Sequence, residues 1–180
     1  MDLMLSLLGV AKLIFGIVVG VVGITVAAKV ATRVGGFPSV DEGLRAGNVA
    51  VGIAVSGSIA AMGILVQHAV RGTFGAVDLL LYARGEQISI GWIFAYGAAH
   101  VALALGVGVA ILVIGMRTFV RLTPDVDEIA EIRDGNVASA LVLASVIIVI
   151  ALLAQQGVET ILNGLLPLPT LGRSGIVAPS

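Results

Sequence analysis

The sequence predicts an all-α integral membrane protein with four transmembrane helices, built as two parallel tandem two-helix repeats. The first observation is composition: the 180 residues are 58% hydrophobic and 12% charged, with a mean hydropathy of +1.12, whereas soluble domains carry about 25% charged residues. The second is a pattern, Gly-Asn-Val-Ala, that begins at Gly47 and again at Gly135, 88 residues later. Each copy adjoins a long apolar stretch, where polar residues are costly in lipid, so the recurrence indicates a duplicated membrane unit.

Composition also narrows the function. The formal net charge of −1 does not favour nucleic acid as a partner. The absence of cysteine excludes disulfides, thiolate metal sites and cysteine nucleophiles. The sequence has no metal-ligand spacing, nucleophile elbow or convergent acid–base pair. We therefore expect neither an enzyme nor a cofactor, and the lipid bilayer is the first partner.

Four apolar stretches are long enough to span a membrane, which takes about 20 residues as a helix. They cover residues 3–31, interrupted only by Lys12; 49–66; 88–116, where His100 is the one residue that titrates near neutral pH; and 137–154. The strands of an outer-membrane barrel would be about ten residues long and strictly alternating. These stretches are longer and do not alternate, so they predict helices.

Two patterns predict where the second and fourth helices begin. Ser39-Val40-Asp41-Glu42 is a capping box and predicts a start near residue 40. Thr123-Pro124-Asp125 predicts a start near residue 124. From there each helix is expected to run without a break through its Gly-Asn pair into the membrane, over about 30 residues or about 45 Å.

The basic residues predict the orientation. Six of them lie in segments 29–47 and 117–135, namely Lys29, Arg33, Arg45, Arg117, Arg121 and Arg133. The positive-inside rule places these segments in the cytoplasm and both termini outside. The expected organisation is repeat one over 1–70, an extracytoplasmic loop over 71–87, repeat two over 88–158 and an extracytoplasmic tail over 159–180. Each repeat has two spans, so the two copies enter with the same orientation.

The Gly-Asn pairs are the first candidate site: Gly47, Asn48, Gly135 and Asn136. An asparagine near the membrane entrance can donate a hydrogen bond to a neighbouring helix, and glycine admits a second backbone. We expect the pairs to pack together and fix the register of the bundle; the alternative is a pore mouth.

Further polar candidates lie within or at the ends of the spans. Gln67 and Gln155 follow the asparagines by 19 residues, about 28 Å of helix, which favours anchors at the opposite interface. Lys12 and His100 are again 88 residues apart. Each lies 17 residues before a basic residue, about 25 Å away, which favours the outer interface, where lysine can snorkel. The alternative is a polar cavity between the repeats.

Two other groups have simpler interpretations. Asp125, Asp127, Glu128 and Glu131 lie where a helix N-terminus attracts acids; cation binding or docking of a cytoplasmic partner is the alternative, although the D-x-D-x-D-G order of a calcium loop is absent. Gly16, Gly20 and Gly23 share one face of the first helix, which predicts tight packing against a neighbouring helix.

The second repeat also resembles a known family. Its segment Glu131-Ile132-Arg133-Asp134-Gly135-Asn136-Val137-Ala138 is similar to the E-[IL]-x-x-G-N-x-A signature of the YjfL-like inner-membrane family, a domain of unknown function. The first repeat departs from the signature, because Gly43 stands where the glutamate should be. The resemblance implies an inner-membrane location and four spans, and it supplies no activity, cofactor or catalytic residue.

These observations leave two hypotheses for function. The first is an oligomerising structural or assembly module of the cytoplasmic membrane, a homo-oligomer whose charged loops bind a soluble cytoplasmic partner. The second is a homo-oligomeric ion channel or small-ion transporter, because an oligomer would multiply the paired polar positions into rings.

Overall fold

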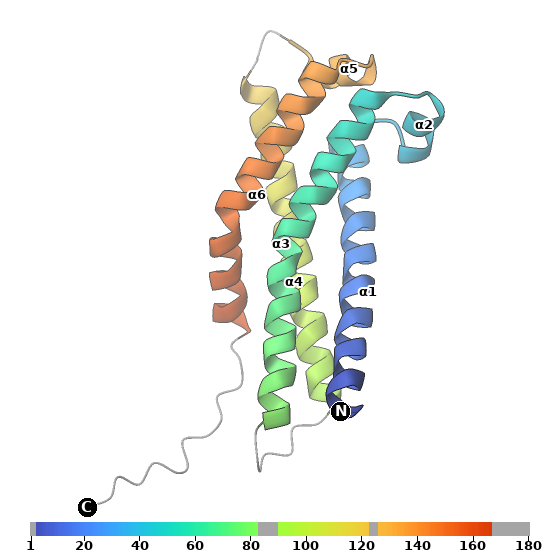
Figure 1. The fold of residues 1–180 in the computed structure, drawn as a ribbon. Helices are drawn as coiled ribbons and strands as arrows, with labels where there is room; N and C mark the ends of the chain where they lie inside the picture. The colour runs from blue at the N-terminus through green and yellow to red at the C-terminus, as the bar shows by residue number, and fades with distance from the viewer. Residues whose placement is uncertain (1–2, 83–89, 123–125, 167–180) are drawn as a thin grey trace, which may run out of the picture.

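The computed structural model describes residues 3–82, 90–122 and 126–166 and contains four long helices and two short ones (Figure 1). The long helices lie side by side, and the short helices lie at the end where α3 and α6 begin. In chain order the helices are α1 (Leu3–Val34), α2 (Val40–Arg45), α3 (Val49–Tyr82), α4 (Ile90–Leu122), α5 (Glu128–Arg133) and α6 (Val137–Leu165). The described residues form no strand, so the predicted all-α class is confirmed.

Each long helix is long and apolar enough to cross a membrane: Leu5–Val34, Val49–Asp78, Gly91–Leu122 and Val137–Leu165. Together these spans confirm the prediction of a multi-pass membrane protein with four transmembrane helices. Their order repeats once, because each half consists of a long helix, a short helix and a second long helix.

The core of the bundle lies along α3, which packs against α1, α4 and α6. Met62 and Leu65 of α3, Leu112 of α4 and Ile147 of α6 are completely buried. The backbones of α3 and α6 also approach closely, since a Cβ added at Gly57 would lie 2.6 Å from the Cβ of Ala144. Small residues permit such contacts between helices in lipid, where packing replaces the hydrophobic effect.

The prediction that each helix runs without a break through its Gly-Asn pair is wrong, because the chain bends at each pair. At the first pair the N–H of Gly47 donates to the carbonyl of Leu44 at 3.1 Å, and the N–H of Asn48 donates to the carbonyl of Gly43 at 3.0 Å. These two bonds form a Schellman motif, which ends a helix at a residue with positive φ. Gly47 supplies that conformation with a φ of +64°.

The second pair repeats the same bend. The N–H groups of Gly135 and Asn136 donate to the carbonyls of Ile132 and Glu131, at 3.1 and 2.8 Å. The φ of Gly135 is +95°. Each glycine therefore ends a short helix, and the asparagine after it starts a long one.

The predicted helix starts have different outcomes. The Ser39 capping box is confirmed: the N–H of Glu42 donates to the Ser39 hydroxyl, and the Ser39 N–H donates to the Glu42 carboxylate at 2.9 Å. The second short helix begins at Glu128, with Asp127 as its N-cap. This start is later than the one expected near residue 124, and Thr123, Pro124 and Asp125 lie outside the described residues.

The expected loop over 71–87 also differs from the structure, because α3 continues to Tyr82. Thr73 and Phe74 continue the helical packing in this part: Phe74 lies against Phe15 of α1, with ring centroids 5.9 Å apart, and Thr73 lies against Gly97 of α4. Residues 83–89 lie outside the described parts. At the other boundary, α6 extends past residue 158 to Leu165, and the rest of the expected tail, from residue 167, is not described.

Candidate functional site

The side chain of Asn48 joins the two repeats. Its Oδ1 accepts a hydrogen bond from the N–H of Val51 at 3.0 Å and so caps the start of α3. Its Nδ2 donates to the carbonyl of Arg133 at 2.8 Å, with a longer contact of 3.4 Å to that of Ile132. These carbonyls lie in the last turn of α5. One amide therefore satisfies the beginning of one helix and the end of another in the opposite repeat.

Asn136 caps the start of α6, but its amide donates to a different kind of partner. Its Oδ1 accepts from the N–H groups of Ala138 and Ser139, at 3.0 and 3.4 Å. Its Nδ2 donates to the carboxylate of Glu131 in the same repeat, at 2.8 Å. The two asparagines are thus equivalent as N-caps and different as donors.

The residue at position 43 explains the difference. Gly43 stands where the second repeat has Glu131, so Asn48 has no carboxylate beside it. Position 43 is tight, because Gly43 is buried and a Cβ there would lie 3.0 Å from Cγ1 of Val51, which would have to shift by a few tenths of an ångström. The missing glutamate leaves the Asn48 amide free to bond across to α5.

Arg133 forms a second link between the repeats. Its Nε donates to the carbonyl of Gly36, in the segment between α1 and α2, at 2.7 Å. Gly36 has a φ of +61°, and a Cβ there would lie 2.5 Å from Nη2 of Arg133. We call Gly36, Asn48 and Arg133 the inter-repeat clamp.

The geometry of the clamp bears on the two roles expected for the Gly-Asn pairs. A Cβ built at Gly47 or Gly135 would meet no described atom within 4 Å, so these glycines act through their backbone conformation and not through close packing. Asn48 does bond across the repeats, as helix registration requires, whereas Asn136 bonds within its own repeat. Registration therefore stays the prediction for Asn48, and Asn136 has a local role.

The acidic residues at this end do not form one site. Asp127 caps α5 by accepting a hydrogen bond from the N–H of Ala130 at 3.0 Å, and Glu131 is bonded to Asn136. Glu128 is 4% exposed, and neither of its oxygens has a hydrogen-bond partner among the described residues. Asp125 lies outside the described residues. In the described parts no three His, Asp or Glu side chains are grouped to hold a metal.

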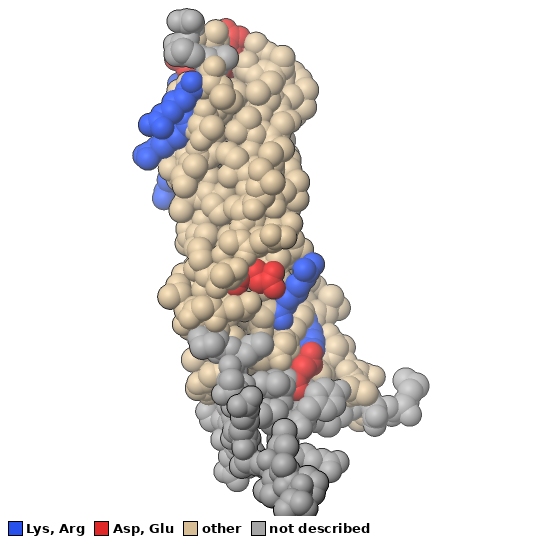
Figure 2. Space-filling view, turned by 90° about the vertical axis from the view of Figure 1, so that its left-hand side faces the viewer, with Lys and Arg blue, Asp and Glu red and all other residues tan. Residues whose placement is uncertain are grey.

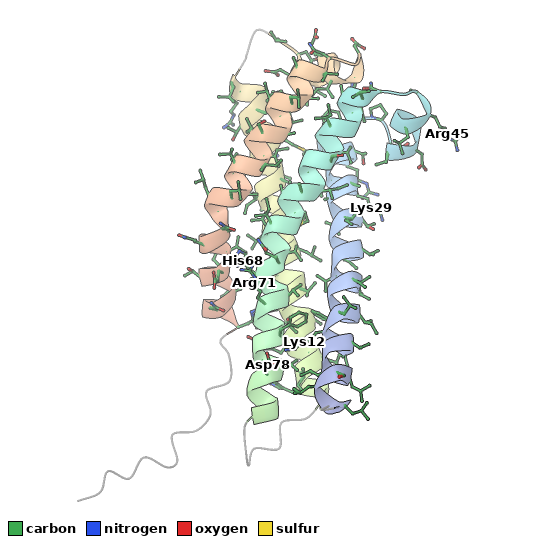
Figure 3. All side chains as sticks on the ribbon, in the orientation of Figure 1. Lys12, Lys29, Arg45, His68, Arg71 and Asp78 are labelled. Carbon is green, nitrogen blue, oxygen red and sulfur yellow. The ribbon has the colours of Figure 1, made fainter. Side chains whose placement is uncertain are left out.

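Toward the other end of the bundle, Lys12 of α1 points into the protein (Figure 3). Its Nζ lies 2.5 Å from the carboxylate of Asp78 on α3 and 5.4 Å from the centroid of the Phe74 ring. Apolar side chains continue beyond it, since Leu3, Leu5 and Leu7 are exposed. Lys12 therefore pairs within its own repeat and not across the two repeats, and its expected place at the outer interface stays a prediction.

His100 is also enclosed. It is 1% exposed, its ring lies 4.5 Å from that of Tyr96, and neither ring nitrogen has a partner among the described residues. Gly72 of α3 leaves room for it, because a Cβ there would lie 3.2 Å from Nε2 of His100. His100 therefore lies between α3 and α4, and its expected place near the outer interface stays a prediction.

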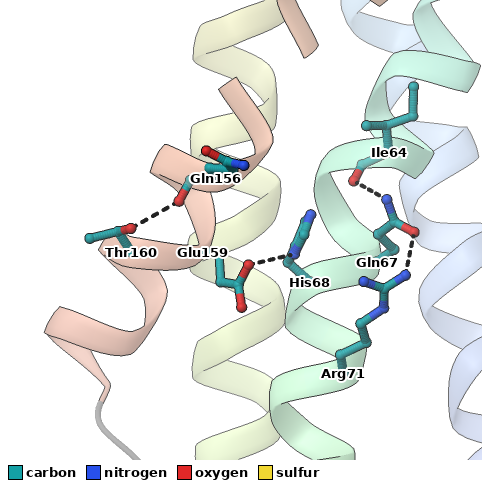
Figure 4. Close-up of polar contacts among 7 residues, drawn as sticks. All are labelled: Ile64, Gln67, His68, Arg71, Gln156, Glu159 and Thr160. Carbon is teal, nitrogen blue, oxygen red and sulfur yellow. Dashed lines mark hydrogen bonds and ion pairs between the residues drawn. The ribbon is translucent and has the colours of Figure 1, made fainter. Parts of the chain in front are cut away.

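Gln67 and Gln155 have unequal environments, and Figure 4 shows that of Gln67. Gln67 donates from Nε2 to the carbonyl of Ile64 at 2.9 Å and accepts from Arg71 at 3.3 Å. Gln155 is half-buried and makes no side-chain hydrogen bond within the described ranges. The glutamines thus share a position in the repeat but not a set of contacts.

Sequence reasoning missed one pair in this region, His68 and Glu159. Nδ1 of His68 lies 3.5 Å from the carboxylate of Glu159 and joins α3 to α6 (Figure 4). A signal was present, because Glu159 lies 88 residues after Arg71 and so repeats a charged position. We call Lys12, His68, Asp78, His100 and Glu159 the polar section of the bundle.

On the surface, a belt without charged side chains separates the end with the inter-repeat clamp from the end with the polar section. Figure 2 shows basic side chains near one end of the molecule, a broad belt without charged side chains, and further charged side chains toward the other end. Such a belt fits the hydrocarbon core of a bilayer, which is about 30 Å thick.

One protein-family model matches the chain twice, over residues 4–98 and 93–177. Its description is Domain of Unknown Function (DUF350). The chain belongs to this family. The two DUF350 copies confirm the internal duplication, and each covers a long helix, a short helix and a second long helix. No curated protein matches the chain, and neither does any solved structure.

Proposed function

We propose that the protein is an oligomerising structural module of the cytoplasmic membrane, whose copies associate through α1. The observation that carries this proposal is an open groove of about 500 Å³ between α1 and α3. Gly16, Gly20 and Gly23 of α1 line it, and Gln67 and Arg71 of α3 lie along its wall.

The sequence predicts tight packing of this glycine face against a neighbouring helix, and the described residues of the same bundle leave most of the face uncovered. A Cβ at Gly16 or Gly20 would meet no described atom within 4 Å, and one at Gly23 would meet only Met62, at 3.8 Å. A G-x-x-x-G face that its own bundle leaves uncovered is suited to the backbone of another helix. The α1 span is also the least buried of the four, which leaves it accessible to a second copy.

The basic end supports the rest of the proposal. Its lysine and arginine side chains favour the cytoplasmic side for α2 and α5, with both termini outside, as the positive-inside rule requires. Exposed acids on these short helices, such as Asp41 and Glu131, offer a docking surface for a soluble partner. This placement agrees with the YjfL-like inner-membrane resemblance.

Single-cysteine crosslinking in liposomes tests the self-association, because the chain has no cysteine of its own. In the symmetric α1–α1 contact, Gly20→Cys brings two Cβ atoms near the separation of about 4 Å that a disulfide needs. Leu153→Cys is the control, since Leu153 is 79% exposed on α6. We expect a covalent dimer for Gly20→Cys only. Equal crosslinking of both variants, or a monomer at every ratio of protein to lipid, contradicts the proposal.

The polar section favours a second candidate, a small-ion pathway. Two ion pairs, Lys12 with Asp78 and His68 with Glu159, join helices that are otherwise apolar. Ionisable residues inside a membrane often mark such pathways. Ion flux into liposomes tests it, with Asp78→Asn and Glu159→Gln expected to reduce the flux. Absence of flux under every ion gradient and pH contradicts the pathway and leaves the structural module standing.

A further inference from the structure

A hollow at the basic end lies between the ends of α1 and α4 and the start of α5. Its volume is about 440 Å³, and its polar lining comes from Arg117 and Arg121 of α4. Val34, Met116 and Val120 provide apolar walls. The hollow thus combines two guanidinium groups with aliphatic surface at the edge of the charge-free belt.

The two arginines have no counter-ion among the residues that the structure describes. Within the described ranges, no Lys or Arg at this end lies within 4.0 Å of an Asp or Glu oxygen, because the two ion pairs present are Lys12–Asp78 and His68–Glu159. Arg117 and Arg121 are both exposed. A basic residue in the last turn of a helix is expected from the helix dipole; this accounts for Arg121, whereas Arg117 lies four residues before it, outside that turn.

The equivalent residues in the first repeat provide a comparison. Lys29 and Arg33 occupy the positions of Arg117 and Arg121, with the same spacing of four residues on α1. They are also exposed, and they do not line this hollow. The two repeats therefore carry the same charge at these positions, and the pair in the second repeat is the one that lines this hollow.

We propose that Arg117 and Arg121 bind the phosphate of an anionic phospholipid headgroup. Guanidinium groups match phosphate oxygens in charge and geometry, and basic pockets between membrane helices on the cytoplasmic side bind such headgroups. A free phosphate has the same charge but no acyl chains. The exposed aliphatic side chains of Val34 and Val120, at 46% and 45%, favour the lipid, whose chains extend along the bundle. This site is independent of the α1 groove.

Native mass spectrometry of the full chain tests the site after reconstitution in nanodiscs of phosphatidylcholine with phosphatidylglycerol. We expect the wild type to retain phosphatidylglycerol. Arg117→Gln combined with Arg121→Gln is expected to weaken retention about tenfold or more relative to the control below, because it removes charge-assisted contacts to the phosphate in addition to general attraction to the anionic surface. Lys29→Gln combined with Arg33→Gln removes the same charge outside the hollow and is expected to retain the lipid.

Three results overturn the proposal. Equal losses of lipid in both double variants show that retention comes from general attraction between a basic surface and an anionic membrane. Displacement of the lipid by inorganic phosphate at equal concentration assigns the hollow to a soluble phosphate compound. No preference of the wild type for phosphatidylglycerol over phosphatidylcholine removes the site. All four substituted residues are exposed, so unchanged thermal unfolding of both double variants checks that neither loss comes from misfolding.

Discussion

The amide of Asn48 donates a hydrogen bond of 2.8 Å to the backbone carbonyl of Arg133. The guanidinium of Arg133 in turn donates to the carbonyl of Gly36 at 2.7 Å. The connection therefore passes from the first repeat to the second and back again. It links the start of α3, the end of α5 and the segment after α1 at one end of the bundle.

Loss of this bond is expected to cost stability beyond loss of the helix cap. Asn48→Ala removes the cap, worth about 1 kcal/mol, and the hydrogen bond to Arg133, worth about another 1 kcal/mol. Asn136→Ala removes an equivalent cap and an exposed contact to Glu131, so its cost is expected to stay near 1 kcal/mol. Thermal unfolding of the two variants in the same detergent measures the difference.

Serine at each position separates the two contributions. Asn48→Ser keeps an oxygen that can cap α3 and removes the amide donor, so we expect it to retain about half of the loss seen for Asn48→Ala. Asn136→Ser is expected to be close to wild type. Equal losses for the two serine variants contradict a special role for the Asn48 amide.

Placing at position 43 the glutamate that the second repeat has at position 131 is expected to destabilise the protein. Gly43→Glu places a Cβ 3.0 Å from Cγ1 of Val51 at a buried position, and such overpacking costs about 1–3 kcal/mol. The Gly43→Ala variant tests the steric part alone, and Val51→Ala combined with Gly43→Ala is expected to recover part of that loss. A Gly43→Glu protein as stable as the wild type shows that position 43 tolerates the glutamate.

The sequence predicted the spans well because lipid leaves few alternatives to a helix of about 20 apolar residues. It failed at the Gly-Asn pairs, although the local signals were available. Glycine just after a short helix and asparagine just before a long one are the usual end and start signals. The duplication drew attention to their spacing, whereas the bend follows from the positive φ of Gly47 and Gly135.

The pair formed by Lys12 and Asp78 is expected to behave as a coupled unit. Their side chains are 23% and 45% exposed, in a part of the bundle flanked by apolar residues. Lys12→Met alone leaves the carboxylate without its counter-ion and is expected to cost about 2–3 kcal/mol. Lys12→Met combined with Asp78→Leu removes both charges and is expected to recover most of that loss.

A double-mutant cycle from chemical unfolding measures this coupling. A coupling energy near zero contradicts the pair and returns Lys12 to the interface, where its ammonium group would be solvated without Asp78. The reversed pair, Lys12→Asp with Asp78→Lys, is a further check because it keeps both charges and exchanges their helices.

Acid is expected to weaken the start of α2. The hydrogen bond from the backbone N–H of Ser39, followed by the contact with its side chain, lowers the pKa of Glu42 from its usual value of 4.5. Because the pKa is lower in the folded state, the stabilisation is fully present above 4.5 and is lost as the pH falls through the lowered value.

Amide hydrogen exchange in α2, followed from about pH 7 to about pH 3, tests this dependence after correction for intrinsic exchange rates. The wild type is expected to lose protection at the acid end of this range. Glu42→Gln removes the titrating group, so its protection is expected to change less with pH. The same acid-side loss in both proteins assigns the effect to another carboxylate.

Neutralising Glu128 is expected to stabilise the protein. Glu128 is 4% exposed, and its oxygens have no hydrogen-bond partner among the described residues, so its charged form carries a desolvation cost. Glu128→Gln keeps the shape and removes the charge, which is expected to raise stability by about 1 kcal/mol. Asp127→Asn is the control, because asparagine caps a helix about as well as aspartate. A loss of stability in Glu128→Gln shows that the carboxylate is satisfied.

The site residues were harder to predict than the spans, for a physical reason. Lys12 and His100 stand out in apolar stretches, but their partners depend on how far the neighbouring helix extends. Asp78 fell in an expected loop, and the continuation of α3 places it beside Lys12. Likewise, His68 and Glu159 meet only because α3 and α6 pack together, which neither apolar stretch indicates alone.

The glutamate at position 131 and the glycine at position 43 have a consequence for the history of the chain. In a homodimer made from one two-helix unit, a single codon sets both positions, so any change in one subunit appears in the other. Joining the units in one polypeptide removes that constraint. One half can then keep a carboxylate beside its asparagine. The other half can lack that carboxylate, so that the amide of its asparagine donates across to the half that keeps it. Separate expression of the halves as two chains preserves this difference, whereas duplication of either half alone abolishes it.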